Sequence, residues 1–277
     1  MKFLSDKHPD LKTICDQNKE KYQTNHPFPN IYFDDFFNEE FLGEVLEEFP
    51  DLSKVSDVVY SNPNEFGKRA GKGEHTLGPK ARLLVHYLNS QPFLEFLQEL
   101  TGIEEKLLPD PYLAGAGYHE IKPGGFLKLH VDFHRHQTTK LDRRLNLLIY
   151  LNKDWEEDYG GHFELWETDM SKMAVRIAPH FNRVALFSTT GNSWHGHPDA
   201  LTCPEDRSRK SLALYYYTNG RPEEEISKSQ KGRITTEFAA RKGMDSNKMK
   251  FFNILVNLAN NVLPKSFVKF IKKFRNK

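Results

Sequence analysis

The stretch that decides the fold is KPGGFLKLHVD, residues 122–132, in which a Pro-Gly-Gly turn leads into a strand-like run. Proline and glycine mark turns, and short apolar alternation predicts a β-strand. Because alternate residues of a strand face the same side of a sheet, His130 and Asp132 point the same way. An imidazole and a carboxylate presented together can bind one metal ion. We therefore expect this strand to carry part of a metal site.

Further short strands are predicted on the carboxyl-terminal side of this stretch. They cover RLNLLIYLN at 144–152, FELW at 163–166, RVALF at 183–187 and SLALYYYT at 211–218. Between about residue 110 and residue 220 no segment of helix length shows a helical period. Short strands separated by turns favour a double-stranded β-helix, or jelly roll. We predict an α+β fold, with a jelly-roll core over residues 107–222 between N-terminal helices and a C-terminal helical extension.

Residues 1–106 are expected to supply a strand and supporting helices that pack on this core. The predicted elements are an edge strand at 27–37, a helix capped by Asn38 that runs to Phe49, and helices at 79–89 and 91–101. Residues 61–74 are rich in glycine and predict a long loop, part of a region that extends to residue 78. Such loops are either without fixed structure or act as lids, and the sequence leaves both open.

Residues 223–277 predict a basic helical extension. From Arg241 onward ten Lys and Arg oppose Asp245 alone, a net charge of +9, so the rest of the chain carries −8 of the total of +1. Apolar residues from Phe251 to Leu263 form an amphipathic helix that Pro264 ends. A basic amphipathic helix can bind an anionic membrane or a protein partner. Packing of its apolar side on the core is favoured for the first half, and the last dozen residues stay open.

A second histidine follows far downstream in SWHG, residues 193–196. His195 completes a set of two histidines and one carboxylate, which leaves open positions on Fe(II) for a chelating co-substrate and dioxygen. This pattern predicts an iron oxygenase. His197 repeats the same spacing, but we favour His195. His134 and His136 are expected to line the mouth of the site or to face solvent.

Five motifs in order extend the pattern beyond the metal ligands. They are His130-x-Asp132, Tyr150-Leu-Asn152, Gly160-Gly161, His195-Gly196 and Arg209-x-Ser211. In this combination, residues 27–220 resemble the 2-oxoglutarate- and Fe(II)-dependent dioxygenases of the prolyl 4-hydroxylase type. The resemblance implies that His130, Asp132 and His195 are the iron ligands.

The resemblance also implies how 2-oxoglutarate is bound. Arg209 takes the position of the residue that binds the far carboxylate, for which a planar guanidinium is suited. An insertion at 201–208 lengthens the gap after His195, so Arg207 and Lys210 remain alternatives. Three aromatic residues are candidates for the same pocket, with core packing equally open for the last two: Tyr150, Phe163 and Tyr118.

The implied reaction is hydroxylation of a substrate C–H bond with release of succinate and CO2. It implies Fe(II), 2-oxoglutarate and dioxygen as cofactors, with ascorbate as a possible supporting reductant. Because Asp132 fills the position that halide takes in related halogenases, hydroxylation is favoured over halogenation. Two alternatives stay open: a cupin-like metalloenzyme that does not use 2-oxoglutarate, and a non-catalytic jelly-roll binding module. The substrate stays unidentified among peptidyl proline, a free amino acid, a carrier-tethered intermediate and a saccharide or lipid-linked group.

Composition sets general limits. A length of 277 residues suits one core with an appendage, and a net charge of +1 gives no overall attraction to nucleic acid. Cys15 and Cys203 do not make a disulfide framework, and no apolar run is long enough for a signal peptide or a membrane span. We therefore expect a cytoplasmic protein.

Overall fold

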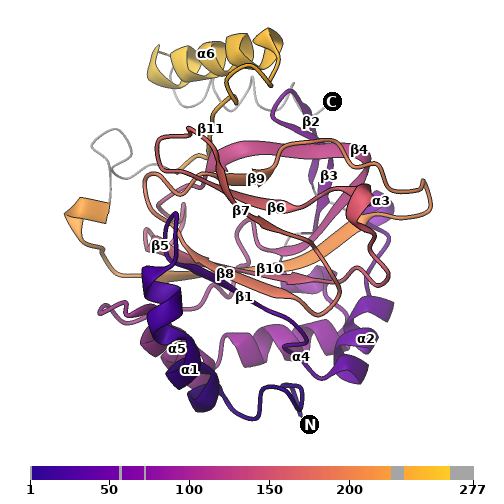
Figure 1. The fold of residues 1–277 in the computed structure, drawn as a ribbon, viewed down its shortest axis with the longest axis vertical. Helices are drawn as coiled ribbons and strands as arrows, with labels where there is room; N and C mark the ends of the chain where they lie inside the picture. The colour runs from indigo at the N-terminus through magenta and orange to yellow at the C-terminus, as the bar shows by residue number, and fades with distance from the viewer. Residues whose placement is uncertain (1, 56–57, 72, 226–233, 263–277) are drawn as a thin grey trace.

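The computed structural model describes residues 2–55, 58–71, 73–225 and 234–262. Within them one antiparallel sheet curls into a nearly closed barrel, in the order β1-β8-β5-β10-β4-β9-β6-β7 (Figure 1). Its strands are β1 Asn30–Phe33, β4 Gly117–Val131, β5 Asp142–Tyr150, β6 Phe163–Trp166, β7 Met173–Ile177, β8 Val184–Ser188, β9 His195–His197 and β10 Arg209–Thr218. The predicted jelly-roll core and the edge position of the first strand are confirmed.

The long strand β4 joins the two layers of the barrel. Its first half pairs with β10 as far as Ile121, and its second half pairs with β9 from Leu127 onward. Between them the chain bends at Pro123-Gly-Gly125. A Cβ atom on Gly125 would lie only 2.7 Å from the side chain of Ile121 and from the backbone oxygen of Lys122, so only glycine fits this bend. The turn read from the sequence therefore redirects a continuous strand.

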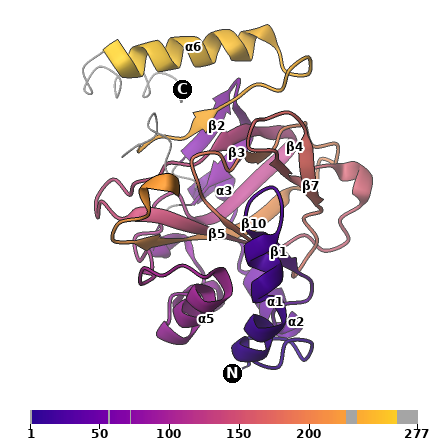
Figure 2. The ribbon, with the colours of Figure 1, turned by 60° about the vertical axis from the view of Figure 1, so that its left-hand side comes forward.

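Five α-helices lie in the first part of the chain, and all but the short third one cover one face of the β1-β8-β5-β10 layer (Figures 1 and 2). The helices are α1 Leu11–Thr24, α2 Glu39–Glu47, α3 Leu52–Val55, α4 Pro79–Leu88 and α5 Gln91–Thr101. Three short 3-10 helices lie elsewhere among the described residues, at η1 Glu74–Thr76, η2 Glu157–Tyr159 and η3 Glu223–Glu225. The predicted helices at 38–49, 79–89 and 91–101 are confirmed. Asn38 caps α2 by accepting a hydrogen bond from the backbone N–H of Phe41 at 2.9 Å. The main apolar core lies between these helices and the sheet.

The first helix, α1, was not predicted. Only Ile14, Cys15 and Tyr22 of its fourteen residues are buried, so its sequence shows a weak apolar stripe. Its N-terminus is capped by Asp10, which accepts a hydrogen bond from the backbone N–H of Thr13 at 2.8 Å. Packing against α5 therefore stabilises this helix more than its own pattern does.

The predicted loop at residues 61–74 is wrong for most of its length. The chain forms a hairpin of β2 Val58–Asn62 and β3 Glu65–Ala70, and β3 pairs with β4. The Asn62 side chain accepts hydrogen bonds from the backbone N–H groups of Asn64 and Glu65 at 2.9 and 3.2 Å and so closes the turn. Glycine and lysine are uncommon in strands, so the sequence did not predict β3. Its pairing with β4 supplies the stability that its local strand propensity lacks.

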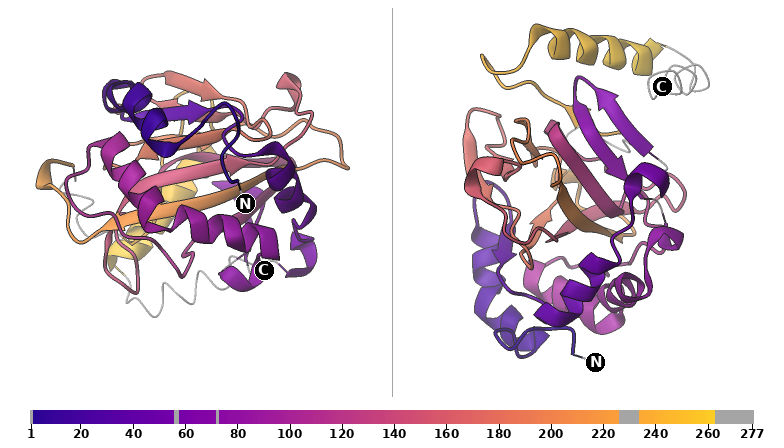
Figure 3. Two further views of the ribbon diagram at one scale, coloured as in Figure 1. Left: turned by 90° about the horizontal axis from the view of Figure 1, so that it is seen from below. Right: turned by 90° about the vertical axis from the view of Figure 1, so that its right-hand side faces the viewer.

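The C-terminal segment crosses the open end of the barrel, opposite the N-terminal helices (Figure 3). It contributes β11 Glu237–Phe238, which pairs with β4 at Val131 and His130, and then α6 Asn247–Val262. Arg241 holds the segment to the barrel with a 2.6 Å ion pair to Asp199, and Asp245 accepts a hydrogen bond from Lys128 at 2.8 Å.

The predicted packing of the apolar residues of α6 on the core is only partly correct. Met249 is buried, whereas Phe251 and Ile254 are 63% and 57% exposed. The remainder of the predicted basic extension, residues 263–277, lies outside the described residues. None of the helices in the described residues is long and apolar enough to cross a membrane.

Candidate active site

Three side chains that the sequence predicted as metal ligands meet inside the barrel. His130 on β4 lies directly opposite His195 on β9, and Asp132 follows the end of β4. The Asp132 carboxylate lies 3.8 Å from His130 Nε2 through Oδ1 and 3.3 Å from His195 Nε2 through Oδ2. Two neighbouring ligands at about 2.1 Å from one metal ion lie about 3 Å apart. The three groups are therefore close to the arrangement that a single ion needs.

Backbone hydrogen bonds orient both imidazoles. His130 Nδ1 donates to the carbonyl of Lys128 at 2.9 Å, and His195 Nδ1 donates to the carbonyl of Ser193 at 2.8 Å. Each bond leaves the Nε2 lone pair free to face the shared position, which is the tautomer that a metal requires. Burial lowers the pKa of His130 to about 3, so this ring is neutral at pH 7 before any metal binds.

A second set of contacts, which the sequence did not reveal, holds Asp132. Asn146 Nδ2 donates to Asp132 Oδ2 at 2.7 Å, and Arg143 Nη2 lies 3.1 Å from the same oxygen. Arg143 Nε also donates to Asn146 Oδ1 at 2.7 Å. The Arg143 guanidinium lies 4.6 Å from the ring centroid of Phe133 and 3.3 Å from that of Tyr215. Burial would raise the pKa of Asp132, but Arg143, His195 and His130 together outweigh it, and the pKa is held well below its usual value.

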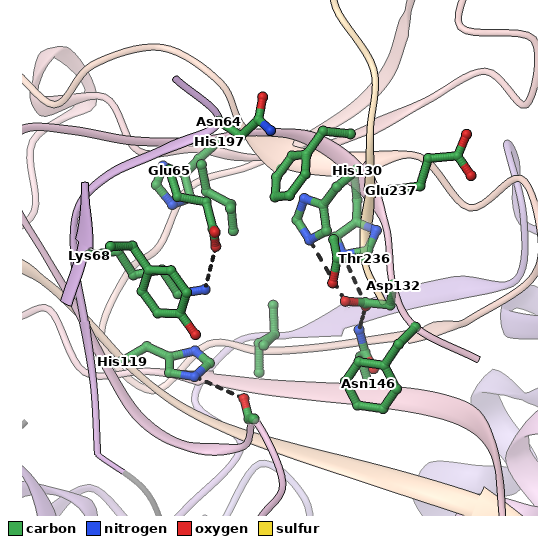
Figure 4. A pocket seen from close by; sticks show the side chains of 18 of the residues that line it. Asn64, Glu65, Lys68, His119, His130, Asp132, Asn146, His197, Thr236 and Glu237 are labelled. Carbon is green, nitrogen blue, oxygen red and sulfur yellow. Dashed lines mark hydrogen bonds and ion pairs between the residues drawn. The ribbon is translucent and has the colours of Figure 1, made fainter. Parts of the chain in front are cut away.

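The site opens into a cavity of about 880 Å³ inside the barrel. Figure 4 shows His130 and Asp132 on one side of it, and Glu65 and His197 on the other. Phe163 lines the cavity, with its ring centroid 5.6 Å from that of His195, and it also belongs to a buried apolar cluster.

Arg209 also lines this cavity, at the start of β10. Its Nε donates to the carbonyl of Gly161 at 2.7 Å, and its guanidinium lies 5.0 Å from the centroid of the Tyr150 ring. Tyr150 itself does not line the cavity, but its hydroxyl is buried beside Arg209, whose charge opposes the rise that burial causes in the pKa of Tyr150. The Arg209 guanidinium in the cavity suits a carboxylate.

The alternatives to Arg209 lie elsewhere. Arg207 donates to the backbone carbonyls of Lys153 and Asp154 at 3.0 and 3.1 Å, and Lys210 Nζ contacts the Ser208 hydroxyl at 2.8 Å. Neither residue lines the cavity. Arg209 is the member of this group that the fold turns inward.

Other candidates take structural positions. Tyr118 does not line the cavity: its ring lies 4.4 Å from that of Phe49 and its hydroxyl donates to the carbonyl of Val45, so it packs in the helix-covered core. His134 and His136 are both buried, so they do not face solvent. Neither of them is among the residues that line the cavity. His136 Nδ1 accepts hydrogen bonds from the backbone of the following turn.

Two walls of the cavity come from segments that the sequence did not assign to the site. The β2-β3 hairpin contributes Tyr60, Asn62, Asn64, Glu65 and Lys68, and the C-terminal segment contributes Thr235, Thr236, Glu237, Phe238 and Asn253. Asn64 Nδ2 donates to Asn253 Oδ1 at 2.8 Å and links the two walls. Lys68 Nζ lies 3.5 Å from Glu65 Oε1, and burial would lower the pKa of Lys68, but Glu65, Tyr60 and Tyr215 together raise it. These contacts depend on long-range strand pairing, so no local pattern could have shown them.

The residues present fit a metal ion and an anionic chelator. Two imidazoles and a carboxylate converge at one point, and a buried guanidinium lies further along the same cavity. Imidazole nitrogens and a carboxylate oxygen are ligands that suit Fe(II).

Comparison with known proteins agrees with this geometry. Residues 116–217 match the 2OG-Fe(II) oxygenase superfamily. The chain is 25% identical over 232 residues to the prolyl 3,4-dihydroxylase OGFOD1 of Ostreococcus tauri. The matched region covers 76% of this chain and 41% of that protein. The chain thus spans less than half the length of this relative.

Solved structures show the same fold. A Trichoplax adhaerens prolyl hydroxylase, solved with a hypoxia inducible factor peptide fragment, superposes with a TM-score of 0.55 at 19% identity over 75% of this chain and 90% of its own. A Pseudomonas putida prolyl-4-hydroxylase gives a TM-score of 0.55 at 14% identity, over 76% of this chain and 100% of its own. Over residues 116–217, the barrel and its His-Asp-His group are similar to the 2OG-Fe(II) oxygenase superfamily. The relative and the two solved structures are themselves described as prolyl hydroxylases or dioxygenases, and the His-Asp-His group of this chain has the donors for Fe(II).

Proposed function

We propose that this protein is a dioxygenase that hydroxylates a C–H bond of its substrate and converts 2-oxoglutarate to succinate and CO2. The observation that carries the proposal is that His130, Asp132, His195 and Arg209 all line one cavity. We assign the first three as Fe(II) ligands. The catalytic core is proposed to comprise residues 107–222, with residues 1–106 as its support and residues 223–277 as the extension.

The chain's own residues position the co-substrate. Arg209 offers paired N–H donors to the distal carboxylate, and the Tyr150 hydroxyl supplies a further donor beside it. Phe163 closes the wall next to His195 and keeps water from that side of the site. Bound iron supplies the activation of dioxygen.

We propose a prolyl residue in a peptide as the substrate. The proposal rests on the printed activity of the relative from Ostreococcus tauri, a prolyl 3,4-dihydroxylase, to which three quarters of this chain is similar. The cavity extends from the metal ligands to Asn64, Asn253 and Glu237, so polar groups for peptide amides lie beside the site. Small-molecule substrates would use the same groups and are an outcome of the test.

The test measures succinate by mass spectrometry, with Fe(II), ascorbate, 2-oxoglutarate and candidate substrates that include prolyl peptides. Succinate formation coupled to a 16 Da gain on the substrate is expected. Asp132→Ala and His130→Ala should abolish both. The matched control is His162→Ala, because His162 is equally buried but outside the cavity, where it contacts Glu157 at 2.8 Å.

Two results would overturn the proposal. Turnover that does not depend on 2-oxoglutarate would indicate a cupin-like metalloenzyme. Failure of the wild-type protein to bind Fe(II) or Mn(II) at micromolar concentration would indicate a binding module without catalysis.

A further inference from the structure

His197 occupies a place in the cavity that the proposed function does not use. Strand β9 is extended, so His197 faces the same side as His195. In the β4 register, His197 lies opposite Leu127, whereas Arg209 lies opposite Ile121 and His195 lies opposite His130. The position of His197 is therefore intermediate along β4, between the metal ligands and Arg209.

The side chain of His197 is buried without a partner. It is 4% exposed, and neither Nδ1 nor Nε2 has a hydrogen-bond partner among the described atoms. A neutral imidazole carries one donor and one acceptor, and leaving them unsatisfied in the interior is unfavourable. Because both nitrogens belong to a residue that lines the cavity, a ligand in the cavity is the natural partner.

The surroundings favour an anionic ligand at this point. Two cationic side chains, Arg209 and Lys68, line the same cavity as His197. Lys68 already has Glu65 as its partner. Arg209 makes no ion pair with a carboxylate in the described part of the chain. Arg209 and His197 therefore both offer N–H donors to a carboxylate that enters this cavity.

We propose that His197 donates a hydrogen bond to the distal carboxylate of 2-oxoglutarate, as a further donor beside Arg209 and Tyr150. This inference rests on the proposed function. A 2-oxo acid chelated at the metal and bound by Arg209 at its far end has to pass along the part of β4 that His197 faces. His197 thereby makes the site selective for a 2-oxo dicarboxylate over a 2-oxo monocarboxylate of the same length.

The test compares two ligands on Mn(II)-loaded protein by isothermal titration calorimetry: 2-oxoglutarate, and 2-oxopentanoate, which has the same chain but no distal carboxylate. His197→Leu should weaken 2-oxoglutarate about tenfold to a hundredfold, the effect of one hydrogen bond to a charged group. Its affinity for 2-oxopentanoate and for Mn(II) should not change. His197→Gln retains an N–H donor and should keep most of the selectivity. The melting temperature of the metal-free His197→Leu protein should be equal to that of the wild type or higher, because an unsatisfied polar group has been removed.

Several outcomes would overturn the inference. Equal weakening of both 2-oxo acids would place His197 at the chelating end, and unchanged 2-oxoglutarate affinity with a raised KM for the hydroxylated substrate would place it in the substrate site. Loss of selectivity in His197→Gln would remove the hydrogen bond as the cause. Each of these results leaves the proposed function intact. No binding of 2-oxoglutarate by the Mn(II)-loaded wild-type protein would overturn both.

Discussion

Replacement of Arg143 by methionine tests whether a buried cation holds the Asp132 carboxylate before metal binds. Arg143 is 1% exposed and 3.1 Å from Asp132, between the rings of Phe133 and Tyr215. Methionine has similar length and fits between two rings, but it leaves the carboxylate without its countercharge. The Asn146 hydrogen bond and the contacts with His130 and His195 then remain.

The expected magnitude follows from the cost of an unpaired buried charge. Removing one partner of a buried ion pair costs about 3–5 kcal/mol. For a protein of this size each kcal/mol lowers the melting temperature by roughly 2–4 °C, so the metal-free Arg143→Met variant should melt about 6–20 °C below the wild type. A bound divalent ion supplies positive charge to Asp132 in place of Arg143. The difference in melting temperature should therefore shrink as Mn(II) is added.

Arg144 provides the matched control. It is the next residue on β5 and is 4% exposed, but it faces the other side of the strand, where it contacts Glu105 at 2.6 Å and Glu225 at 3.0 Å. Arg144→Met should also lower the melting temperature. Differential scanning fluorimetry over a Mn(II) series distinguishes the two. A constant difference for Arg143→Met across the series, parallel to that of Arg144→Met, would refute the assignment of Arg143 to the metal site.

Three further variants test single features of the cavity. Arg209→Lys keeps the charge but loses the paired donors, so the affinity of Mn(II)-loaded protein for 2-oxoglutarate should fall about tenfold or more, while Arg207→Lys should leave it unchanged in the same titration. Gly161→Ala should weaken 2-oxoglutarate but not Mn(II) binding: φ is +69° there, and a Cβ would lie 2.8 Å from Arg209 Cδ. Equal affinity for 2-oxoglutarate in calorimetry would show that the arginine is not displaced. Burial lowers the pKa of His119 from 6.5 to about 3, so its contribution to stability is present above pH 6.5 and is lost as pH falls toward 3. His119→Gln should therefore reduce the dependence of the unfolding free energy on pH by about 1.4 kcal/mol per pH unit between these values, measured by urea denaturation, and an unchanged slope would contradict a neutral His119.

Local sequence patterns predicted the features that depend on residues close together in the chain. The period of two placed His130 and Asp132 on one face of a strand, and cap residues located α2 near Asn38 and α5 before Gly102. The polar pattern of α1 and the glycine-rich hairpin at 58–70 were missed, because both depend on packing against distant elements rather than on their own sequence.

The sequence by itself determined the chemistry that this chain can carry: a strand with His130 and Asp132, a later His195, and a basic cluster at 207–210 ahead of an apolar strand. Tertiary structure alone decided which cation of the 207–210 cluster lines the cavity. Pairing with β4 aligned Arg209 with Ile121 and turned it inward, whereas Arg207 stayed in the loop.

The same holds for the groups around the metal site. Arg143 contacts Asp132, and His197 lies unpartnered between the metal ligands and Arg209, because strands far apart in sequence pair in one register. Register is a property of the folded sheet: a shift by one residue would turn each of these side chains to the opposite face. A local sequence pattern gives the residue types, and the long-range hydrogen-bonded ladder decides which of them meet.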